Sequence, residues 1–223
     1  MIIPQQLQNP DFRFVLLGKW NEFKTTGDKQ ISQAKIPFEK DWQNNGYKFD
    51  DPKLLKHFES KKNYGVIGGY GNLRIIDIDD VELANEMLDL IHTFTVRTGS
   101  GGTHFYILSD YSTNHVFSNG QGEFRANKYQ VVGANCIHPS GNVYNIIKDI
   151  PIAAYTVQQV EELIGPLLRQ TDVIEVQGDS SRSSQEFKEV IKLIRANKTQ
   201  EDVYDYMKNF DKWKDAHPKY REY

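Results

Sequence analysis

The stretch that decides the fold is residues 73–91, "LRIIDIDDVELANEMLDLI". Its first seven residues form a short isoleucine-rich run, which predicts a buried β-strand. In the rest of the stretch, apolar side chains recur at i, i+4, i+5 and i+8 and so line one face of a helix: Leu83, Met87, Leu88 and Ile91. Asp80 stands just before this pattern, and its carboxylate suits the N-cap of that helix. We therefore expect a strand that leads directly into a helix.

Similar β-rich runs lie on both sides of this unit, and Gly, Asn, Asp or Ser bounds each of them. They cover residues 64–69, 94–98, 104–109, 129–137 and 143–148. The first sixty residues are aromatic and polar with several turn signals, and residues 156–170 predict a helix that Gly165 and Pro166 disturb. Because strands and helices mix along the chain without strict alternation, the sequence predicts an α+β fold.

The end of the chain differs from the rest. Residues 171–182 have the composition of a linker, and residues 183–223 carry helical patterns that start at a capping box formed by Ser183 and Glu186. Two helices cannot enclose a core by themselves, so they either pack on the α/β part or begin a larger helical domain. We expect a domain at 1–170, a linker at 171–182 and a helical segment at 183–223.

Composition excludes several classes of protein. The chain has 223 residues, 39% of them hydrophobic and 26% charged, with a net charge of −3 and a single cysteine, Cys136. One cysteine cannot form an internal disulfide or a cysteine-based zinc cluster. The apolar runs are too short for a membrane span and no signal peptide is evident, so we expect a soluble cytoplasmic protein. The net charge also argues against non-specific coating of nucleic acid.

Asp77 and Asp79 are two residues apart on the predicted strand. Side chains alternate along a strand, so both carboxylates point to one face about 7 Å apart. Two neighbouring acids repel each other unless a cation neutralises them, and Mg²⁺ or Mn²⁺ prefers carboxylate oxygen. The alternative is that one of these acids faces solvent at the strand end while another caps the helix.

The stretch "TGSGGTH", residues 98–104, places glycines around Ser100, and only Thr103 separates them from His104. Glycines allow a tight turn with exposed N–H groups, which can hold an anion such as a phosphate, and Ser100 and His104 could donate to the same group. The alternative is an ordinary hairpin turn that is followed by a half-buried strand histidine.

Two further pieces follow within forty residues. In "GEFRANK", Glu123 and Arg125 fall on the same side of a short strand and Lys128 lies near a turn. Such a pair is commonly a surface ion pair worth less than about 1 kcal/mol. The phrase "HPSG", residues 138–141, predicts a turn, in which His138 could equally be solvated.

Together these pieces resemble the bifunctional primase-polymerase (prim-pol) family of the archaeo-eukaryotic primase superfamily. The shared order is a paired-Asp strand, a helix, Gly-Ser-Gly-Gly-x-His, an acid with a basic neighbour, and His-Pro-Ser-Gly. The phrase "AKIPFEKDW" is also similar, so the resemblance spans most of residues 30–145. It implies an RRM-like catalytic sheet with flanking helices and an N-terminal α/β portion, followed by a small helical C-terminal segment.

The resemblance implies a role for each matched position. The catalytic residues, which also bind two Mg²⁺ or Mn²⁺ ions, are Asp77, Asp79 and Glu123, where the family usually has Asp at the last position. The nucleotide-binding residues are Ser100, Gly101, Gly102, His104, Arg125, Lys128 and His138.

The function expected from this resemblance is a DNA primase-polymerase that synthesises or extends primers on single-stranded DNA by two-metal nucleotidyl transfer. The expected substrates are a template, a primer and dNTPs or NTPs. The family context implies a helicase domain or replication or CRISPR-linked proteins as partners, and plasmids, viruses or mobile elements as hosts. The alternatives are a non-catalytic replication-initiation module that binds nucleic acid and a metal-dependent nuclease. A nuclease needs no glycine-rich phosphate cradle, and a binding module needs no aligned acids.

Overall fold

The computed structural model describes residues 2–168. The chain divides into two units, Met1–Gln170 and Thr171–Tyr223, and the description concerns the first of them. The predicted linker at 171–182 and helical segment at 183–223, with its capping box, lie outside the described residues. The division of the chain into these three parts therefore stays a prediction.

The described part contains three α-helices, three short 3-10 helices and twelve strands. In the first half of the chain these are η1 (Gln5–Leu7), β1 (Arg13–Leu16), β2 (Phe23–Thr26), β3 (Lys29–Ser32), α1 (Pro52–Glu59), β4 (Tyr64–Ile67), η2 (Tyr70–Asn72) and β5 (Leu73–Ile78). The second half contains α2 (Val81–Leu90), β6 (Thr95–Arg97), β7 (Thr103–Leu108), β8 (His115–Val116), η3 (Ser118–Gly120), β9 (Gly122–Arg125), β10 (Gln130–Val132), β11 (Asn145–Lys148), β12 (Ala153–Ala154) and α3 (Val157–Leu168). The predicted α+β class is confirmed.

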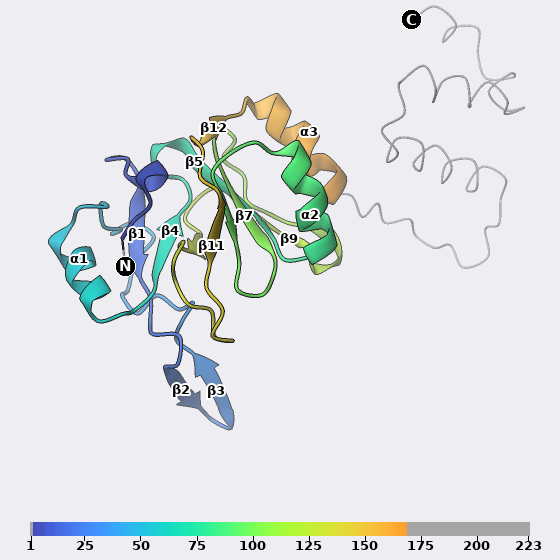
Figure 1. The fold of residues 1–223 in the computed structure, drawn as a ribbon. Coiled ribbons are helices and arrows are strands. Elements are labelled where there is room, and N and C mark those ends of the chain that lie inside the picture. The colour runs from blue at the N-terminus through green and yellow to red at the C-terminus, as the bar shows by residue number, and fades with distance from the viewer. Residues whose placement is uncertain (1, 169–223) are drawn as a thin grey trace, which may run out of the picture. The chain divides into compact units, whose positions relative to one another are not determined.

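The largest sheet has seven strands, and β5 lies at its centre. Its order is β11-β6-β7-β5-β9-β8, with β12 pairing in parallel beside β7. Figure 1 labels β5, β7, β9, β11 and β12 of this sheet. Strand β5 pairs antiparallel with β7 on one side and with β9 on the other. All six of its residues are buried, the four aliphatic ones and also the charged Arg74 and Asp77.

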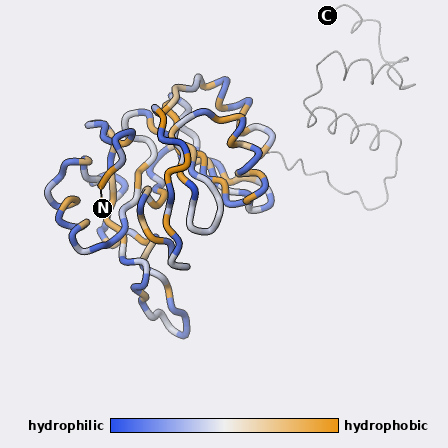
Figure 2. The backbone as a smooth tube through the Cα atoms, in the orientation of Figure 1, coloured by the Kyte–Doolittle hydropathy of each residue, from blue (hydrophilic) through white to orange (hydrophobic). Residues whose placement is uncertain are grey.

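The two faces of this sheet bury different cores because successive side chains of a strand point to opposite faces. On one face, Ile76 and Ile78 pack with α2 and α3, through residues such as Met87 and Ile164. On the other face, Ile75 joins a second core that includes strands β1, β4 and β10. The hydrophobic segments follow these central strands (Figure 2). Asp77 shares the face of Ile75, away from α2 and α3.

The N-terminal portion adds a smaller antiparallel sheet of order β1-β4-β10 and a separate two-stranded hairpin, β2-β3. The hairpin projects away from the two sheets (Figure 1). Helix α1 begins after Asp51, whose carboxylate accepts from the backbone N–H of Lys53, and Pro52 occupies its first turn. Apart from β10, these elements precede the large sheet in the chain and form an N-terminal α/β portion. None of the helices within residues 2–168 has the length and apolar character needed to cross a membrane.

Asp80 caps α2 as the sequence predicts. Its carboxylate accepts a hydrogen bond of 2.8 Å from the backbone N–H of Leu83. We expect Asp80→Ala to lower the free energy of unfolding by about 1 kcal/mol, because the first turn of α2 then loses this partner. Urea denaturation would measure the loss. Glu86→Ala, on the exposed side of the same helix, is the control and should change stability by less than about 0.5 kcal/mol.

The prediction that Gly165 and Pro166 disturb the last helix is wrong. Helix α3 continues through Pro166 to Leu168. Proline removes one backbone N–H donor, but it leaves the apolar stripe of the helix intact. Ile164 and Leu167 on both sides of it are buried with the α2 face of the large sheet. Burial of this stripe outweighs the loss of one hydrogen bond near the helix end.

Candidate active site

Three side chains that the sequence singled out lie in one row across the large sheet. In the strand register Asp77 of β5 is directly opposite His104 of β7 on one side and Glu123 of β9 on the other. Residues directly opposite on neighbouring strands share a face and have Cβ atoms about 5 Å apart. The structure therefore brings together side chains that are 46 positions apart in the chain.

The carboxylate of Asp77 is held from both sides. His104 Nε2 lies 3.3 Å from Asp77 Oδ1, and Arg125 Nε lies 3.0 Å from Asp77 Oδ2. The same guanidinium extends to Glu123, with Arg125 Nη2 3.1 Å from Glu123 Oε2. The Glu123–Arg125 pair is thus more than a surface ion pair, because Arg125 bridges two acids of neighbouring strands.

These contacts set the charge of Asp77. Burial raises the pKa of a carboxyl group, but His104 and Arg125 outweigh that effect and lower the pKa of Asp77 to about 2. Asp77 is therefore ionised at neutral pH. Asp79 differs, because partial burial and then the nearby charge of Asp77 raise its pKa. Its side chain is exposed just beyond the end of β5, and its N–H donates to the carbonyl of Gln121 at 2.8 Å.

The carboxylate oxygens of these acids are suitable ligands for a divalent cation. As placed, no three acidic, histidine or cysteine side chains within residues 2–168 converge closely enough to hold a metal ion. The position between Asp77 and Glu123 nevertheless already accommodates a positive charge, which Arg125 supplies. Carboxylate oxygens are the donors that Mg²⁺ and Mn²⁺ prefer. The two carboxylates are therefore suited to bind a divalent ion once Arg125 no longer contacts them.

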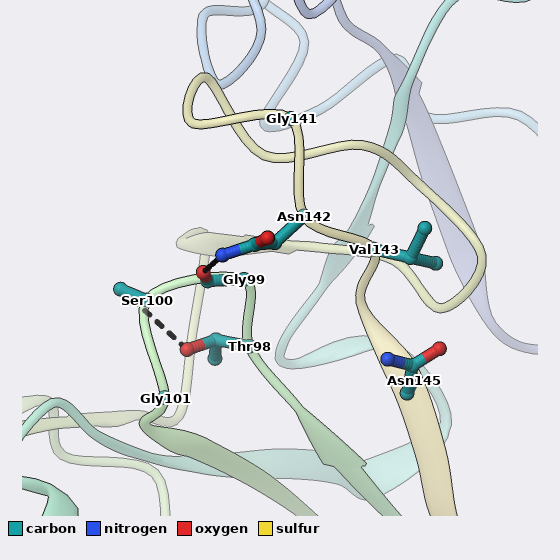
Figure 3. Close-up of a pocket in the computed structure, with 8 residues that line it drawn as sticks. All are labelled: Thr98, Gly99, Ser100, Gly101, Gly141, Asn142, Val143 and Asn145. Carbon is teal, nitrogen blue, oxygen red and sulfur yellow. Dashed lines mark hydrogen bonds between the residues drawn. The ribbon is translucent and has the colours of Figure 1, made fainter.

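The glycine turn forms a hollow beside this row. The hollow has a volume of about 580 Å³ and is lined by Thr98, Gly99, Ser100, Gly101, Gly141, Asn142, Val143 and Asn145 (Figure 3). These residues come from the β6-β7 turn and from the segment that leads into β11. The sequence phrases "TGSGG" and "HPSG" thus meet in space, as the resemblance implies.

Hydrogen bonds fix the β6-β7 turn. The N–H of Thr98 donates to the carbonyl of Gly102 at 2.8 Å, and Arg97 Nη1 donates to the carbonyl of Gly101 at 2.9 Å. Thr98 Oγ1 and Ser100 Oγ lie 3.0 Å apart, while Ser100 itself is exposed (Figure 3). The turn is therefore held from inside and presents its serine outward.

Two positions of the turn have no room for a side chain, which explains why they are glycines. A Cβ on Gly99 would lie 2.2 Å from the Cβ of His138, and a Cβ on Gly102 would lie 2.2 Å from the carbonyl oxygen of Ile78. Asn142 also donates to the carbonyl of Gly99 at 2.8 Å (Figure 3). The absence of side chains lets the turn approach both the H-P-S-G segment and the end of β5.

The H-P-S-G segment is the predicted turn. The N–H of Gly141 donates to the carbonyl of His138 at 2.8 Å, and Gly141 has a φ of 92°. His138 Nδ1 accepts from the N–H of Ser140 at 3.1 Å and lies 2.9 Å from its hydroxyl. Burial, and then the charge of Lys35, lower the pKa of His138. His138 therefore serves the turn through Nδ1 and is biased toward the neutral form.

His104 is more buried than the sequence suggests. It is 4% exposed, and its ring lies 5.8 Å from that of Tyr144, which in turn lies 5.9 Å from that of His138. His104 Nδ1 is buried with no hydrogen-bond partner among the described residues. Its Nε2 faces Asp77, so the structure places His104 against the acid row, with the Tyr144 ring between it and His138.

Lys128 lies elsewhere. It lines a second hollow together with Trp42 and Tyr129, and not the glycine hollow.

Three residues that support the site were not predicted from the sequence: Arg97, Lys35 and Asn142. Arg97 braces the glycine turn, and Asn142 joins the two turns. The charge of Lys35 contributes to the lowered pKa of His138 and partly opposes the rise in the pKa of Asp79. The phrase "AKIPF" was the one available signal for Lys35.

Comparison with known proteins identifies the family. No curated protein matches the chain. The family described as "Prim-Pol: Bifunctional DNA primase/polymerase, N-terminal" matches residues 15–156, which include β5, β7, β9 and both turns. Polymerases of this kind are metal-dependent nucleotidyltransferases with DNA and nucleotides as substrates. The chain therefore belongs to the bifunctional DNA primase/polymerase (Prim-Pol) family.

Proposed function

We propose that this chain extends or synthesises primers on single-stranded DNA by two-metal nucleotidyl transfer at the row formed by His104, Asp77 and Glu123. The observation that carries the proposal is the cross-strand register that aligns these side chains next to the glycine hollow. The sheet supplies negative charge for a cation, and the hollow supplies space for the phosphates of a nucleotide.

In this proposal Asp77, Asp79 and Glu123 hold the metal ions. When bound there, Mg²⁺ or Mn²⁺ would lower the pKa of a primer 3′-hydroxyl and would neutralise the charge that develops on the pyrophosphate. Arg125 now bridges Asp77 and Glu123, so it must release at least one of them. Its guanidinium is then free to pair with a phosphate group of the nucleotide, for which its planar fork is well suited.

The glycine turn would position the triphosphate. Ser100 is exposed on the hollow, and the turn is held in place by Arg97 and Asn142. Exposed turn backbone and a hydroxyl are typical donors for phosphate oxygen. Because the turn is braced before a ligand arrives, little ordering cost is left for nucleotide binding. His104 contacts the Asp77 carboxylate through Nε2, at 3.3 Å.

Gly99→Ala tests the role of the turn. The new Cβ would lie 2.2 Å from the Cβ of His138, so the two turns must separate. We expect the KM for dNTP to rise by about tenfold, since small displacements of positioning groups are costly. Steady-state primer extension would measure the change. Gly165→Ala is the matched control, because Gly165 lies in helix α3, has no positive φ and has nothing within 4 Å of an added Cβ. An unchanged KM in Gly99→Ala would remove the turn from nucleotide binding.

A second candidate function is a nucleic-acid-binding module without catalysis, and one observation favours it. Arg125 already neutralises Asp77 and Glu123, which a purely structural ion-pair network would also require. Primer extension with labelled dNTPs and Mg²⁺ or Mn²⁺ on a primed single-stranded template separates the candidates. Template-dependent extension supports the polymerase. Intact, unextended DNA supports the binding module, and shortened DNA would indicate a nuclease.

A further inference from the structure

A second hollow lies apart from the glycine turn. Its volume is about 560 Å³, and its lining residues are Asp41, Trp42, Gln43, Asn44, Lys128 and Tyr129. They come from two segments more than eighty positions apart: the loop before α1 and the turn between β9 and β10. The lining combines two large aromatic side chains, two amide side chains, one cation and the carboxylate of Asp41. None of the functions discussed above uses Trp42 or Tyr129.

The loop wall of this hollow is built in advance. The Asp41 carboxylate accepts from Asn44 Nδ2 at 2.6 Å and from Asn45 Nδ2 at 2.8 Å. The hydroxyl of Tyr70 donates to the carbonyl of Gln43 at 2.9 Å. Such a braced wall keeps its shape without a ligand, which reduces the entropy lost on binding.

The opposite wall is equally fixed. The N–H of Lys128 donates to the carbonyl of Gly68 at 3.0 Å, and the N–H of Gly68 donates to the carbonyl of Tyr129 at 2.8 Å. Lys128 has a φ of 58°, and Asp41 on the other wall has a φ of 56°. Non-glycine residues adopt this left-handed conformation rarely and at a cost, and such residues concentrate at functional sites. Here one lies in each wall of the same hollow.

The aromatic lining suits a flat ligand. Trp42 is half-buried against the core, so its ring is anchored, whereas Tyr129 is 49% exposed. The Arg125 guanidinium lies 5.8 Å from the centre of the Tyr129 ring. The Arg13 guanidinium lies 5.5 Å from the centre of the Tyr70 ring, and the Tyr70 hydroxyl donates to the carbonyl of Gln43 in the loop wall. Aromatic rings beside Arg and Lys form the combination that stacks nucleobases while pairing with their phosphates.

The second hollow and the glycine hollow lie on opposite sides of β5, which leaves room for two substrates. The glycine turn joins β6 to β7 on one side of β5, whereas Lys128 and Tyr129 follow β9 on its other side. The two hollows thus flank Asp77 from opposite directions. Arg125 connects them, because it contacts both Asp77 and the Tyr129 ring.

We propose that the hollow between Trp42 and Tyr129 binds a base of the single-stranded DNA template, with Lys128 pairing to the adjacent phosphate. The proposal rests on the polymerase function inferred above and names the site at which that function engages its template. The incoming nucleotide is the other source of a base, but its phosphates are assigned to the glycine hollow on the opposite flank of β5. A template base can therefore occupy the second hollow while a nucleotide occupies the first.

Fluorescence anisotropy of a labelled oligo-dT, measured with the full chain and without nucleotide, tests this site. We expect Tyr129→Ala to weaken binding about tenfold, because stacking of one base on an aromatic ring contributes that much affinity. Tyr129→Phe keeps the ring and should retain most of the affinity. Lys128→Gly removes the charge while it accepts the left-handed backbone, and it should reduce the salt dependence of binding. Phe23→Ala, at 52% exposure on the β2-β3 hairpin, is the matched control and should bind as the unmodified chain does.

The outcomes separate this inference from the proposed function. Equal oligo-dT affinity for Tyr129→Ala and the unmodified chain would overturn the inference, even if primer extension is normal. Weaker oligo-dT binding by Tyr129→Ala, with restored binding by Tyr129→Phe, would support it even if no extension occurs. If Tyr129→Ala instead weakens the binding of free dNTP and leaves oligo-dT binding intact, the hollow belongs to the incoming nucleotide and the template assignment is wrong.

Discussion

Asp77→Asn is expected to reduce template-directed primer extension by about a thousandfold. The substitution keeps the size of the side chain but removes the ionised carboxylate at the centre of the row, which is charged at neutral pH because of His104 and Arg125. Removal of one well-placed electrostatic group commonly costs a hundredfold to a thousandfold in rate, and a metal ligand belongs at the upper end (~10³). Extension of a labelled primer in Mg²⁺ would measure the loss.

Asp110→Asn provides the control for this prediction. Asp110 is exposed and its contact is with Asn72 Nδ2 at 2.7 Å, away from the row. Its extension rate should stay within about twofold of the unmodified chain, since the effect of a surface substitution on folding is small. Thermal unfolding of both variants would show whether the fold is retained. Extension by a folded Asp77→Asn protein at the normal rate would remove Asp77 from catalysis.

Gly122→Ala is expected to destabilise the protein by about 3 kcal/mol, the largest effect on folding that we predict. Gly122 begins β9 with a φ of 144°, and a Cβ there would lie 2.0 Å from the carbonyl oxygen of Asp77 and 2.9 Å from the Cα of Ile78. Backbone strain and overpacking each cost about 1–3 kcal/mol. Both backbone atoms belong to the central strand, so neither can move aside without disturbing the acid row.

Gly120→Ala distinguishes the cost of backbone strain from the cost of a steric clash with β5. Gly120 also has a positive φ, at 68°, but nothing lies within 4 Å of its added Cβ. We expect it to cost about 1 kcal/mol, which is the strain contribution alone. Urea denaturation of the two variants side by side would measure the difference. Equal losses would show that β9 can shift away from β5 and that the close approach of the two strands is not required.

The sequence was sufficient for the central strand and its helix. The apolar spacing in residues 81–91 and the cap at Asp80 are local features, and the structure confirms both of them. Local patterns also predicted the glycine and H-P-S-G turns. The helix around Pro166 was misjudged, since burial of Ile164 and Leu167 is a tertiary effect that the presence of a proline does not reveal.

The alignment of the site could not be predicted from residue spacing. That Asp77 lies opposite both His104 and Glu123 depends on the register of β7 and β9 with β5, which is fixed by long-range packing. The bridge by Arg125 follows from that register, because Arg125 shares a face with Glu123. The hollow between Trp42 and Tyr129 joins two segments that no local pattern relates. Family resemblance supplied the site residues, but their contacts required the structure.

Mn²⁺ binding tests the central claim most directly, because the acid row is proposed to hold the metal although Arg125 now bridges it. The measurement is an EPR titration of free Mn²⁺ with the full chain in the presence of dNTP, repeated with Asp77→Asn/Glu123→Gln and with the Asp110→Asn control. We expect Mn²⁺ binding by the unmodified chain and by Asp110→Asn, and its loss in the double variant. Equal Mn²⁺ binding by the double variant, in a protein that still unfolds cooperatively, would contradict it.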